Sequence, residues 1–295
     1  MVRDLDAAGA FYQRLGFTVG ARNRHPWGTH NRIVQLPGFF IELLTLGEGE
    51  RIASPAPGTI SFGAFTRDFL ARGEGLAMLV LEGKNAEADV DAFRRAGIGD
   101  FAPFRFEREG RTPDGRAVKL GFSLAFARDP LAPDTCFFTC QQHYPENFWN
   151  PAFQAHANGA NAIGAIVLVA ENPSDHHIFL SAFSGVRDLH STSAGVTVET
   201  PRGAIQAMDP AAFRLHFGVA PPDVSAGARL AAARFVVRDL AATRDLLGKA
   251  GIAAREHMGR IVVGPEAALG ATLAFAAQQA PLTGAARGRM VRRTC

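Results

Sequence analysis

The stretch "VRDLDAAGAFYQRLGF" (2–17) decides the fold, because its pattern returns near the other end of the chain as "VRDLAATRDLLGKAGI" (237–252). Apolar residues in the first copy recur at helical spacing, and a carboxylate before each helix can accept backbone N–H bonds. We therefore predict a helix in each copy, capped by Asp4 or Asp6 in the first and by Asp239 in the second.

The same order of strand, capping residue, helix and glycine occurs at 79–98 and at 166–186. Glycine suits the left-handed conformation that ends a helix. The glycines expected at the four helix ends are Gly16, Gly97, Gly185 and Gly251. A pattern that recurs in this way marks an internal repeat, which sets the fold before any local assignment.

Strand-like segments follow each helix, separated by breaks that contain proline or glycine. After the first helix they read "TVGARNRH", "HNRIVQL" and "FFIELLTL". Each unit is therefore predicted to be βαβββ. The leading strand of the first unit would lie upstream of Met1, so we expect a first strand to be missing, through a shortened start or because a partner chain supplies it.

The composition bounds the class of protein. The chain has 295 residues, 47% hydrophobic and 20% charged, which suits two globular domains. No apolar run could cross a membrane and no signal peptide is visible, so we expect a cytoplasmic protein without a membrane partner. Three cysteines, Cys136, Cys140 and Cys295, cannot build a disulfide framework. The net charge of +3 comes partly from a basic tail at 281–295, expected to be disordered rather than a nucleic-acid site.

Four βαβββ units with a "VRDL…FY…LGF" opening resemble the vicinal oxygen chelate superfamily, which includes glyoxalase I, extradiol dioxygenases and bleomycin-resistance proteins. The stretches "WGTHNRIVQLPGFFIELL" (27–44) and "DTCFFTCQQHYPENFW" (134–149) are most similar to its glyoxalase-like branch. The resemblance implies an α+β fold with four tandem βαβββ units in two paired, curled-sheet half-barrel domains. These domains would span 1–152 and 153–280, the second as a degenerate copy, with a linker near 150–161.

In metal-dependent members of that superfamily, one ligand lies on the first strand of a unit and a glutamate lies on the last strand. Glu42 matches that glutamate, so the resemblance implies that Glu42 binds a divalent metal. On an alternating strand Glu42 shares a face with Phe40 and Leu44, where an unpaired charge would be costly. Glu42 is therefore a candidate metal ligand or general base. The structural alternatives are a buried glutamate paired with an arginine, or a strand whose polar face is exposed to solvent.

The first-strand positions of the other units fall on Met78, Ile166 and Ala232, and none of these is a ligand of the expected kind. The extradiol arrangement, with its metal in the third and fourth units, is therefore not supported. A divalent metal remains an option only between the first two units, with Glu42 and a group from "CFFTCQQHY" (136–144).

Registering "FFIE" on "FFTC" places Cys140 opposite Glu42 in the paired units. Gln141 and His143 then lie on the other face of that strand. His143 is a second catalytic candidate, or else a hydrogen-bonded histidine at a strand end. The expected substrate contacts come from two loops and are Trp27, His30, Asn31, Gln141, Tyr144 and Trp149. Each loop has a structural alternative, in which its aromatic residues only pack or close the domain.

The leading expectation is a glyoxalase-like protein with a substrate cleft in the half that spans 1–150. Its chemistry would be a metal-assisted lyase, isomerase or dioxygenase reaction on a small oxygenated substrate. The alternative is a metal-free protein that sequesters an apolar or aromatic compound. The first-strand positions favour this alternative, while the resemblance favours the enzyme. A third hypothesis is an inactive chain whose missing strand carried a needed ligand. A small molecule is the expected partner in the first two cases, and the chain could also pair as a homodimer.

Overall fold

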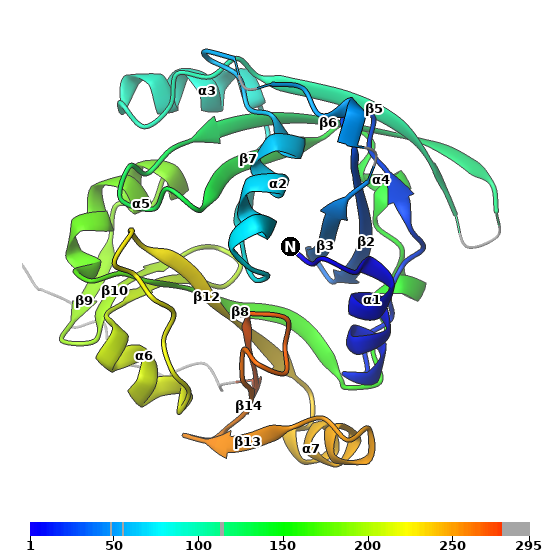
Figure 1. The fold of residues 1–295 in the computed structure, drawn as a ribbon, viewed down its shortest axis with the longest axis vertical. Coiled ribbons are helices and arrows are strands. Elements are labelled where there is room, and N and C mark those ends of the chain that lie inside the picture. Colours follow the sequence, from blue (N-terminus) through cyan, green and yellow to red (C-terminus); the bar gives the residue numbers. More distant parts are fainter. Residues whose placement is uncertain (48, 55, 113–114, 279–295) are drawn as a thin grey trace, which may run out of the picture.

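The structure, a computed structural model, describes residues 1–47, 49–54, 56–112 and 115–278. Its strands form three sheets (Figure 1). The N-terminal sheet has the order β1 (Asn23–Arg24), β2 (Thr29–Leu36) and β3 (Phe39–Leu46). The second sheet has the order β4 (Met78–Glu82), β7 (Cys136–Gln142), β6 (Ala117–Ala127) and β5 (Phe104–Arg111). The third has the order β13 (Ala254–His257), β14 (Arg260–Val263), β15 (Thr272–Ala277), β12 (Arg229–Val237), β8 (Ala160–Val169), β11 (Ala204–Met208), β10 (Gly195–Glu199) and β9 (Leu189–Thr192).

The helices connect these strands and cover the sheets. They are α1 (Leu5–Arg14), α2 (Phe62–Arg72), α3 (Ala86–Arg95), α4 (Pro145–Phe148), α5 (His177–Ser184), α6 (Pro210–Phe217) and α7 (Leu240–Lys249). Short 3-10 turns lie at η1 (Gly49–Arg51), η2 (Pro151–Phe153) and η3 (Pro173–His176). Over the described ranges, no helix has both the length and the apolar character needed to cross a bilayer. The predicted tail at 281–295, with Cys295, lies outside the described residues.

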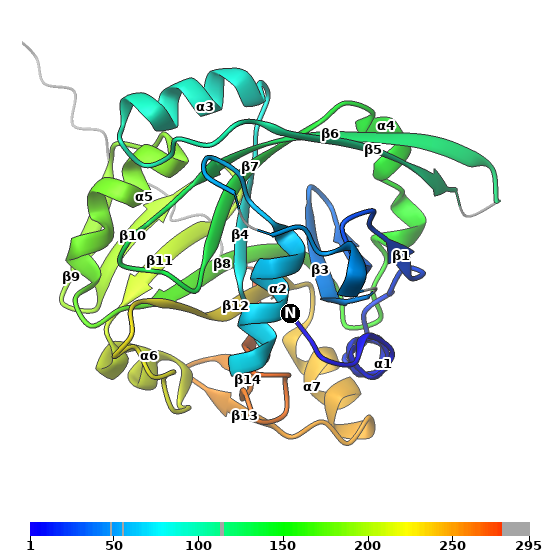
Figure 2. The ribbon, with the colours of Figure 1, turned by 45° about the horizontal axis from the view of Figure 1, so that its top comes forward.

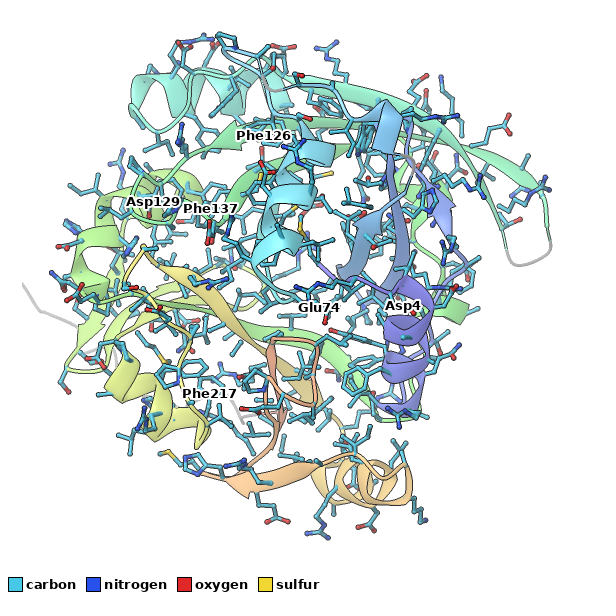
Figure 3. All side chains as sticks on the ribbon, in the orientation of Figure 1. Asp4, Glu74, Phe126, Asp129, Phe137 and Phe217 are labelled. Carbon is cyan, nitrogen blue, oxygen red and sulfur yellow. The ribbon has the colours of Figure 1, made fainter. Side chains whose placement is uncertain are left out.

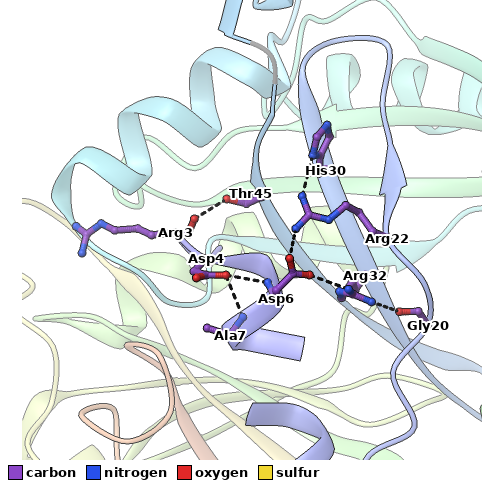
Figure 4. Close-up of polar contacts among 9 residues, drawn as sticks. All are labelled: Arg3, Asp4, Asp6, Ala7, Gly20, Arg22, His30, Arg32 and Thr45. Atoms are coloured by element: carbon purple, nitrogen blue, oxygen red, sulfur yellow. Dashed lines mark hydrogen bonds and ion pairs between the residues drawn. The ribbon is translucent and has the colours of Figure 1, made fainter. Parts of the chain in front are cut away.

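The predicted helix caps are confirmed at both copies of the opening pattern. The Asp4 side chain accepts hydrogen bonds from the backbone N–H groups of Asp6 and Ala7, at 2.9 and 3.0 Å (Figure 4). The Asp239 side chain accepts one from Ala242 in the same way. Backbone φ angles of +85° at Gly16 and +65° at Gly251 end the two helices in the left-handed conformation, as the sequence predicts.

Three runs of the chain share one element order, in which a strand and a helix are followed by three strands. They begin at β4, β8 and β12, and in each run the first strand pairs in parallel with the last one. The strands β8 and β12 also pair with each other, antiparallel, and so join two runs into one eight-stranded sheet. The sheets curl, and the mixed α+β fold is confirmed. Before α1, the Val2 N–H donates a 2.9 Å hydrogen bond to the Leu44 carbonyl on β3.

Besides the one-turn helix α4, two helices that the sequence pattern did not predict lie between runs. The helix α2 joins β3 to β4 and lies against β2 and β3 (Figure 2). Its start is capped by Ser61, whose side chain accepts from the Ala64 N–H at 3.3 Å. The helix α6 joins β11 to β12, and Phe217 on it points toward the third sheet (Figure 3). Each helix therefore covers one curled face.

Two of the apolar cores are shared between the two halves of the chain, while two others lie within one half each. One core joins α1, β2 and β3 to α7, β12, β14 and β15. Within it, the Phe17 ring centroid lies 5.0 Å from that of Phe235 and 6.2 Å from that of Phe275. A second core joins β7 to α5, where the Phe137 and Phe179 centroids are 4.7 Å apart. Each of these two shared cores therefore depends on residues from both halves.

The segment predicted as a linker, 150–161, is bonded to the N-terminal half. The Asn158 side-chain amide donates to the Leu15 carbonyl at 2.8 Å, and Asn158 is 2% exposed. His156 accepts from the Thr18 N–H through Nδ1 at 3.0 Å, and its Nε2 lies 2.6 Å from the Gln35 carbonyl oxygen. The segment thus crosses from one half to the other in contact with α1 and β2.

Candidate functional site

A cavity of about 80 Å³ lies between the concave faces of the first two sheets. Its wall is mostly apolar and rich in phenylalanine, with polar groups gathered on β5 and around β1 to β3. The apolar lining residues are Trp27, Ile33, Phe40, Leu44, Phe62, Met78, Val80, Phe106, Phe122, Leu124, Phe138 and Phe148. The others are His25, Thr29, Asn31, Glu42, Arg108 and Cys140. A few polar groups in an apolar concavity are typical of a small-molecule site.

Strand alternation places Glu42 in this cavity. The register pairs Glu42 on β3 with Ile33 on β2, and both line the cavity together with Phe40 and Leu44. The predicted shared face of these β3 residues is therefore confirmed. The Glu42 side chain is 32% exposed, so its charge keeps part of its hydration. It forms no ion pair with an arginine among the described residues, and the alternative of a buried, arginine-paired glutamate is therefore not what the structure shows.

Asn31 on β2 holds the Glu42 carboxylate. Its Nδ2 donates a 2.6 Å hydrogen bond to Glu42 Oε1, while its Oδ1 accepts a 3.0 Å hydrogen bond from Asn23 Nδ2. Asn31 is 2% exposed, so its amide has little water to bond instead. A buried amide with both ends bonded is fixed in one orientation. The carboxylate therefore has one oxygen occupied by a buried donor.

His25 lies next to Glu42, in the turn that enters β2. Its Nδ1 shares a 2.9 Å hydrogen bond with Thr29 Oγ1, and its Nε2 lies 3.9 Å from Glu42 Oε1. The ring stacks on Trp27, with 4.6 Å between centroids and 13° between planes. Burial lowers the pKa of His25 below its ordinary value of 6.5, and the nearby Glu42 charge opposes this shift. The imidazole is therefore neutral at pH 7 and can both donate and accept.

Arg108 extends from β5 into the same cavity. Its Nη1 donates to Asn23 Oδ1 at 3.4 Å and to the Glu109 carbonyl at 3.3 Å. Burial lowers the pKa of Arg108, and the charge of Glu42 acts in the opposite direction. Since Asn23 also bonds Asn31, a chain of polar contacts connects Arg108 to Glu42.

The structure brings three of the predicted site residues into the cavity, namely Trp27, Asn31 and Glu42. His30 is next to Asn31 on β2 and therefore faces away. It is buried at 7% exposure, and its Nδ1 lies 3.4 Å from Nη1 of Arg22, which also binds Asp6 (Figure 4).

The other four predicted residues also lie outside the cavity wall. Gln141 accepts a 3.0 Å hydrogen bond from the Ala86 N–H at the start of α3. The exposed His143 ring bonds Ser123 Oγ at 2.8 Å. The Tyr144 ring makes a cation–π contact with Lys119, whose ammonium lies 5.4 Å from the ring centroid. Trp149 packs behind the lining residue Phe148, with 4.9 Å between centroids.

Two basic lining residues, His25 and Arg108, were not among the predicted site residues. His25 occurs in "HPWGT" (25–29), which the sequence shows only as a turn. Arg108 occurs in "FRFEREGR" (104–111), where strand alternation puts it on the face of Phe104 and Phe106. An arginine on the phenylalanine face of a strand was therefore the available signal.

The C-terminal half holds an apolar cluster at α6, and a group of basic residues, Arg234, Arg260 and His216, lies beside it, with Arg260 over the Phe217 ring. Phe213 and Phe217 of α6 pack there against Ala231 and Ala232 of β12, and they are 0% and 2% exposed. The predicted first-strand positions therefore carry apolar residues in apolar surroundings. The helix α6 packs directly on this part of the third sheet.

The described residues do not fit a divalent metal held by three protein ligands. Within the described ranges, no group of three His, Cys, Asp or Glu side chains converges. Glu42 and His25 are two candidate donors, but an amide hydrogen of Asn31 already occupies Glu42 Oε1. Burial raises the pKa of the Cys140 thiol to about 12, and the Glu42 charge adds to this shift. Metal sites in proteins need three or four converging donors, with the thiol deprotonated.

Comparisons with solved structures show the fold. A hypothetical protein from Staphylococcus aureus is similar with a TM-score of 0.62 and 11% identity, over 89% of this chain and 91% of that one. A triple mutant of 4-hydroxymandelate synthase from Streptomyces coelicolor is similar with a TM-score of 0.52 and 12% identity, over 95% and 92%. A fusion of a xylose isomerase-like TIM barrel and a 4-hydroxyphenylpyruvate dioxygenase is similar with a TM-score of 0.52 and 14% identity, over 96% of this chain and 48% of the fusion.

Among curated proteins, none matches this sequence. One family model matches, that of the glyoxalase-like domain, and it covers residues 1–183. The match includes α1, all three strands of the first sheet and the whole wall of the cavity. Because it covers more than half of the chain, and because the curled α+β fold agrees with it, the protein belongs to the glyoxalase-like domain family.

Proposed function

We propose that the cavity of this glyoxalase-like protein binds a small, largely aromatic molecule, and that Glu42 is the group that accepts a hydrogen bond or a proton from it. One observation carries the proposal: a partly exposed carboxylate at the polar end of a phenylalanine-lined cavity. An aromatic wall gives apolar burial and edge-to-face contacts to a ring. The carboxylate then supplies orientation, because its second oxygen accepts no hydrogen bond from the residues that the structure describes.

The neighbours of Glu42 support an acid–base role. Asn31 fixes the carboxylate, and the neutral His25 lies within 3.9 Å of it. A carboxylate within hydrogen-bond reach of a ligand can accept a proton from it as a general base. A ligand with an acidic O–H or C–H next to Glu42 would give up that proton to it. A lyase or isomerase reaction would then start at this atom.

Metal-assisted chemistry of the lyase, isomerase or dioxygenase kind has less support from the side chains described. It would need a third donor beside Glu42 and His25, and none converges on them within the described ranges. The metal-free alternative needs only the groups present. Isothermal titration of the protein with Mn²⁺, Fe²⁺, Ni²⁺ and Zn²⁺ separates the two, since only the metal-assisted proposal expects binding that Glu42→Gln removes.

We also propose that the chain is organised as four repeated units in two halves, 1–152 and 153–280. Support comes from the three βαβββ runs that begin at β4, β8 and β12, and from the matching helix caps at Asp4 and Asp239. In this proposal the first half keeps an open cleft. The second half serves as a support, with α6 packed on its sheet.

Tryptophan fluorescence tests the binding proposal. The chain has two tryptophans, of which Trp27 lines the cavity, so Trp149→Phe leaves Trp27 as the reporter. Titration with 3-hydroxybenzyl alcohol, a neutral aromatic probe, should give saturable quenching. Glu42→Gln should weaken that binding by about tenfold, because a hydrogen bond to a charged acceptor contributes about 1.5–3 kcal/mol.

The matched control is Glu109→Gln, which changes a carboxylate of β5 that is exposed and outside the cavity wall. Its binding curve should overlay that of the parent protein. Absence of saturable quenching by this probe and by a panel of neutral phenols would refute the binding proposal. Equal weakening in both variants would remove Glu42 from the site.

A further inference from the structure

Arg108 differs from the other cations of its hairpin. Arg105, on the same strand, is exposed and forms an ion pair with Glu87, and Lys119 on β6 pairs with Glu107 at 2.8 Å. Arg108 lies on the opposite face, in the cavity wall, and forms no ion pair with any carboxylate of the described residues. A partly buried cation without a carboxylate partner is costly, and proteins retain one where a ligand compensates it.

The guanidinium of Arg108 has N–H donors that bond no acceptor among the described residues. Both of its hydrogen bonds to described residues, to Asn23 Oδ1 at 3.4 Å and to the Glu109 carbonyl at 3.3 Å, use Nη1 and are long. Nε and Nη2 have no acceptor among the described residues. These two nitrogens form the edge that binds a carboxylate with two parallel hydrogen bonds.

The charges of the cavity then define the ligand. The opposite charges of Arg108 and Glu42 attract each other, but the two side chains form no ion pair. Neither charge is therefore balanced by direct contact with the other. A neutral ring would leave Arg108 uncompensated. A ring with only a carboxylate would bring a like charge toward Glu42. A ring that carries a carboxylate and a hydrogen-bond donor satisfies both groups.

We infer that the cavity selects a hydroxy- or amino-substituted aromatic carboxylate, with its carboxylate on Arg108 and its donor on Glu42. The ring would lie among Phe106, Phe122 and Trp27, which line the wall near these groups. This inference rests on the proposed binding function and adds the charge of the ligand to it. Arg108 is the specificity-determining residue.

Isothermal titration with matched probes tests the inference. The 2-, 3- and 4-hydroxybenzoates are compared with 3-hydroxybenzyl alcohol, which lacks the negative charge, and with benzoate, which lacks the donor. At least one hydroxybenzoate should bind about tenfold tighter than either comparison ligand, as expected for one charge-assisted pair. Arg108→Gln should remove that advantage while changing the binding of the alcohol less than about twofold.

Arg105→Gln is the matched control, because it removes an equal charge from the exposed face of the same strand. It should leave the preference for hydroxybenzoate intact. If the alcohol binds as tightly as every hydroxybenzoate, or if Arg105→Gln abolishes the preference as fully as Arg108→Gln does, the inference is overturned while the binding proposal stands. If neither the alcohol nor any hydroxybenzoate binds, the binding proposal fails and this inference fails with it.

Discussion

Asn31 Nδ2 lies 2.6 Å from Glu42 Oε1, and the two residues occupy neighbouring antiparallel strands on the same cavity-facing side. Their register positions are diagonal, since Asn31 is opposite Leu44 and Glu42 is opposite Ile33. Diagonal neighbours on one sheet face are within reach of polar side chains. The contact therefore follows from the strand register, and the register fixes the one carboxylate in the cavity wall.

Replacing Asn31 with leucine should destabilise the protein modestly. Leucine keeps the volume but removes the hydrogen bonds of Asn31 to Glu42 Oε1 and Asn23 Nδ2, so that Asn23 Nδ2 keeps only its 3.3 Å hydrogen bond to the Ala21 carbonyl. Because the carboxylate is partly exposed and can be rehydrated, we expect a loss of about 1–2 kcal/mol in the free energy of unfolding. Urea denaturation measures it. Asn147→Leu, which removes a surface hydrogen bond to the Lys119 carbonyl, should cost less than about 1 kcal/mol, and equal losses would contradict the prediction.

The buried His25 should make stability depend on pH. Its pKa in the folded protein is lowered below 6.5, chiefly by burial, so the unfolded chain binds more protons as the pH falls through 6.5. The free energy of unfolding should therefore fall on acidification, from about pH 6.5 down to the folded pKa. His156, whose pKa burial also lowers, contributes in the same direction. His25→Gln should reduce the slope without abolishing it.

Urea denaturation at closely spaced pH values gives that slope for the parent and the variant. NMR titration of the imidazole C–H signals measures the folded pKa of His25 directly. A signal assigned to His25 that titrates above 6.5 would show that the Glu42 charge outweighs burial, which is the opposite sign.

Phe213 should be among the most sensitive positions of the C-terminal half. It is fully buried where α6 packs into the third sheet, so Phe213→Ala leaves a void. We expect a loss of about 3–5 kcal/mol in unfolding free energy. Leu215, two residues away on the same helix, is 65% exposed, and Leu215→Ala should change stability by less than about 0.5 kcal/mol. Thermal or urea unfolding distinguishes the two, and similar effects would argue against the packing of α6.

Gly270 should tolerate no side chain. Its φ is +77°, and a Cβ built on it would lie 2.1 Å from the Glu74 carbonyl oxygen. Gly97 also has a positive φ, +68°, but no atom lies within 4 Å of its built Cβ. Gly97→Ala should therefore cost only the backbone strain, about 1–2 kcal/mol, and Gly270→Ala clearly more. Urea denaturation of both variants makes the comparison, and a smaller loss at Gly270 would show that the backbone there can move.

The features that could be predicted from the sequence are those set by interactions between residues close together in the chain. Caps such as Asp4 and end glycines such as Gly16 act within one turn, so their roles do not depend on distant residues. Strand alternation acts over short distances as well, and it placed Phe40, Glu42 and Leu44 on one face. The repeat pattern extended these local rules to the curled α+β fold.

The composition of the cavity depends on which faces meet, and no local rule contains that information. Strand alternation allows either Asn31 or His30 to face the cavity. Only the packing of the two sheets against each other places Asn31 in the cavity wall and His30 on the opposite face. Arg108 comes from a hairpin far along the chain, on the second sheet, and it meets Glu42 only after the two sheets pack. The helix α6 was missed because it lies between repeats, where the recurring pattern says nothing.

The packing of the Phe17 ring against Phe235 and Phe275 has a consequence for dividing this chain into its halves. Expressing 1–152 alone would uncover one side of α1, and expressing 153–278 alone would uncover the matching aromatic surface around β12 and β15. Each of the two fragments would expose a large apolar surface to solvent, which promotes aggregation. The two halves should therefore regain the native state only when they are co-expressed and associate.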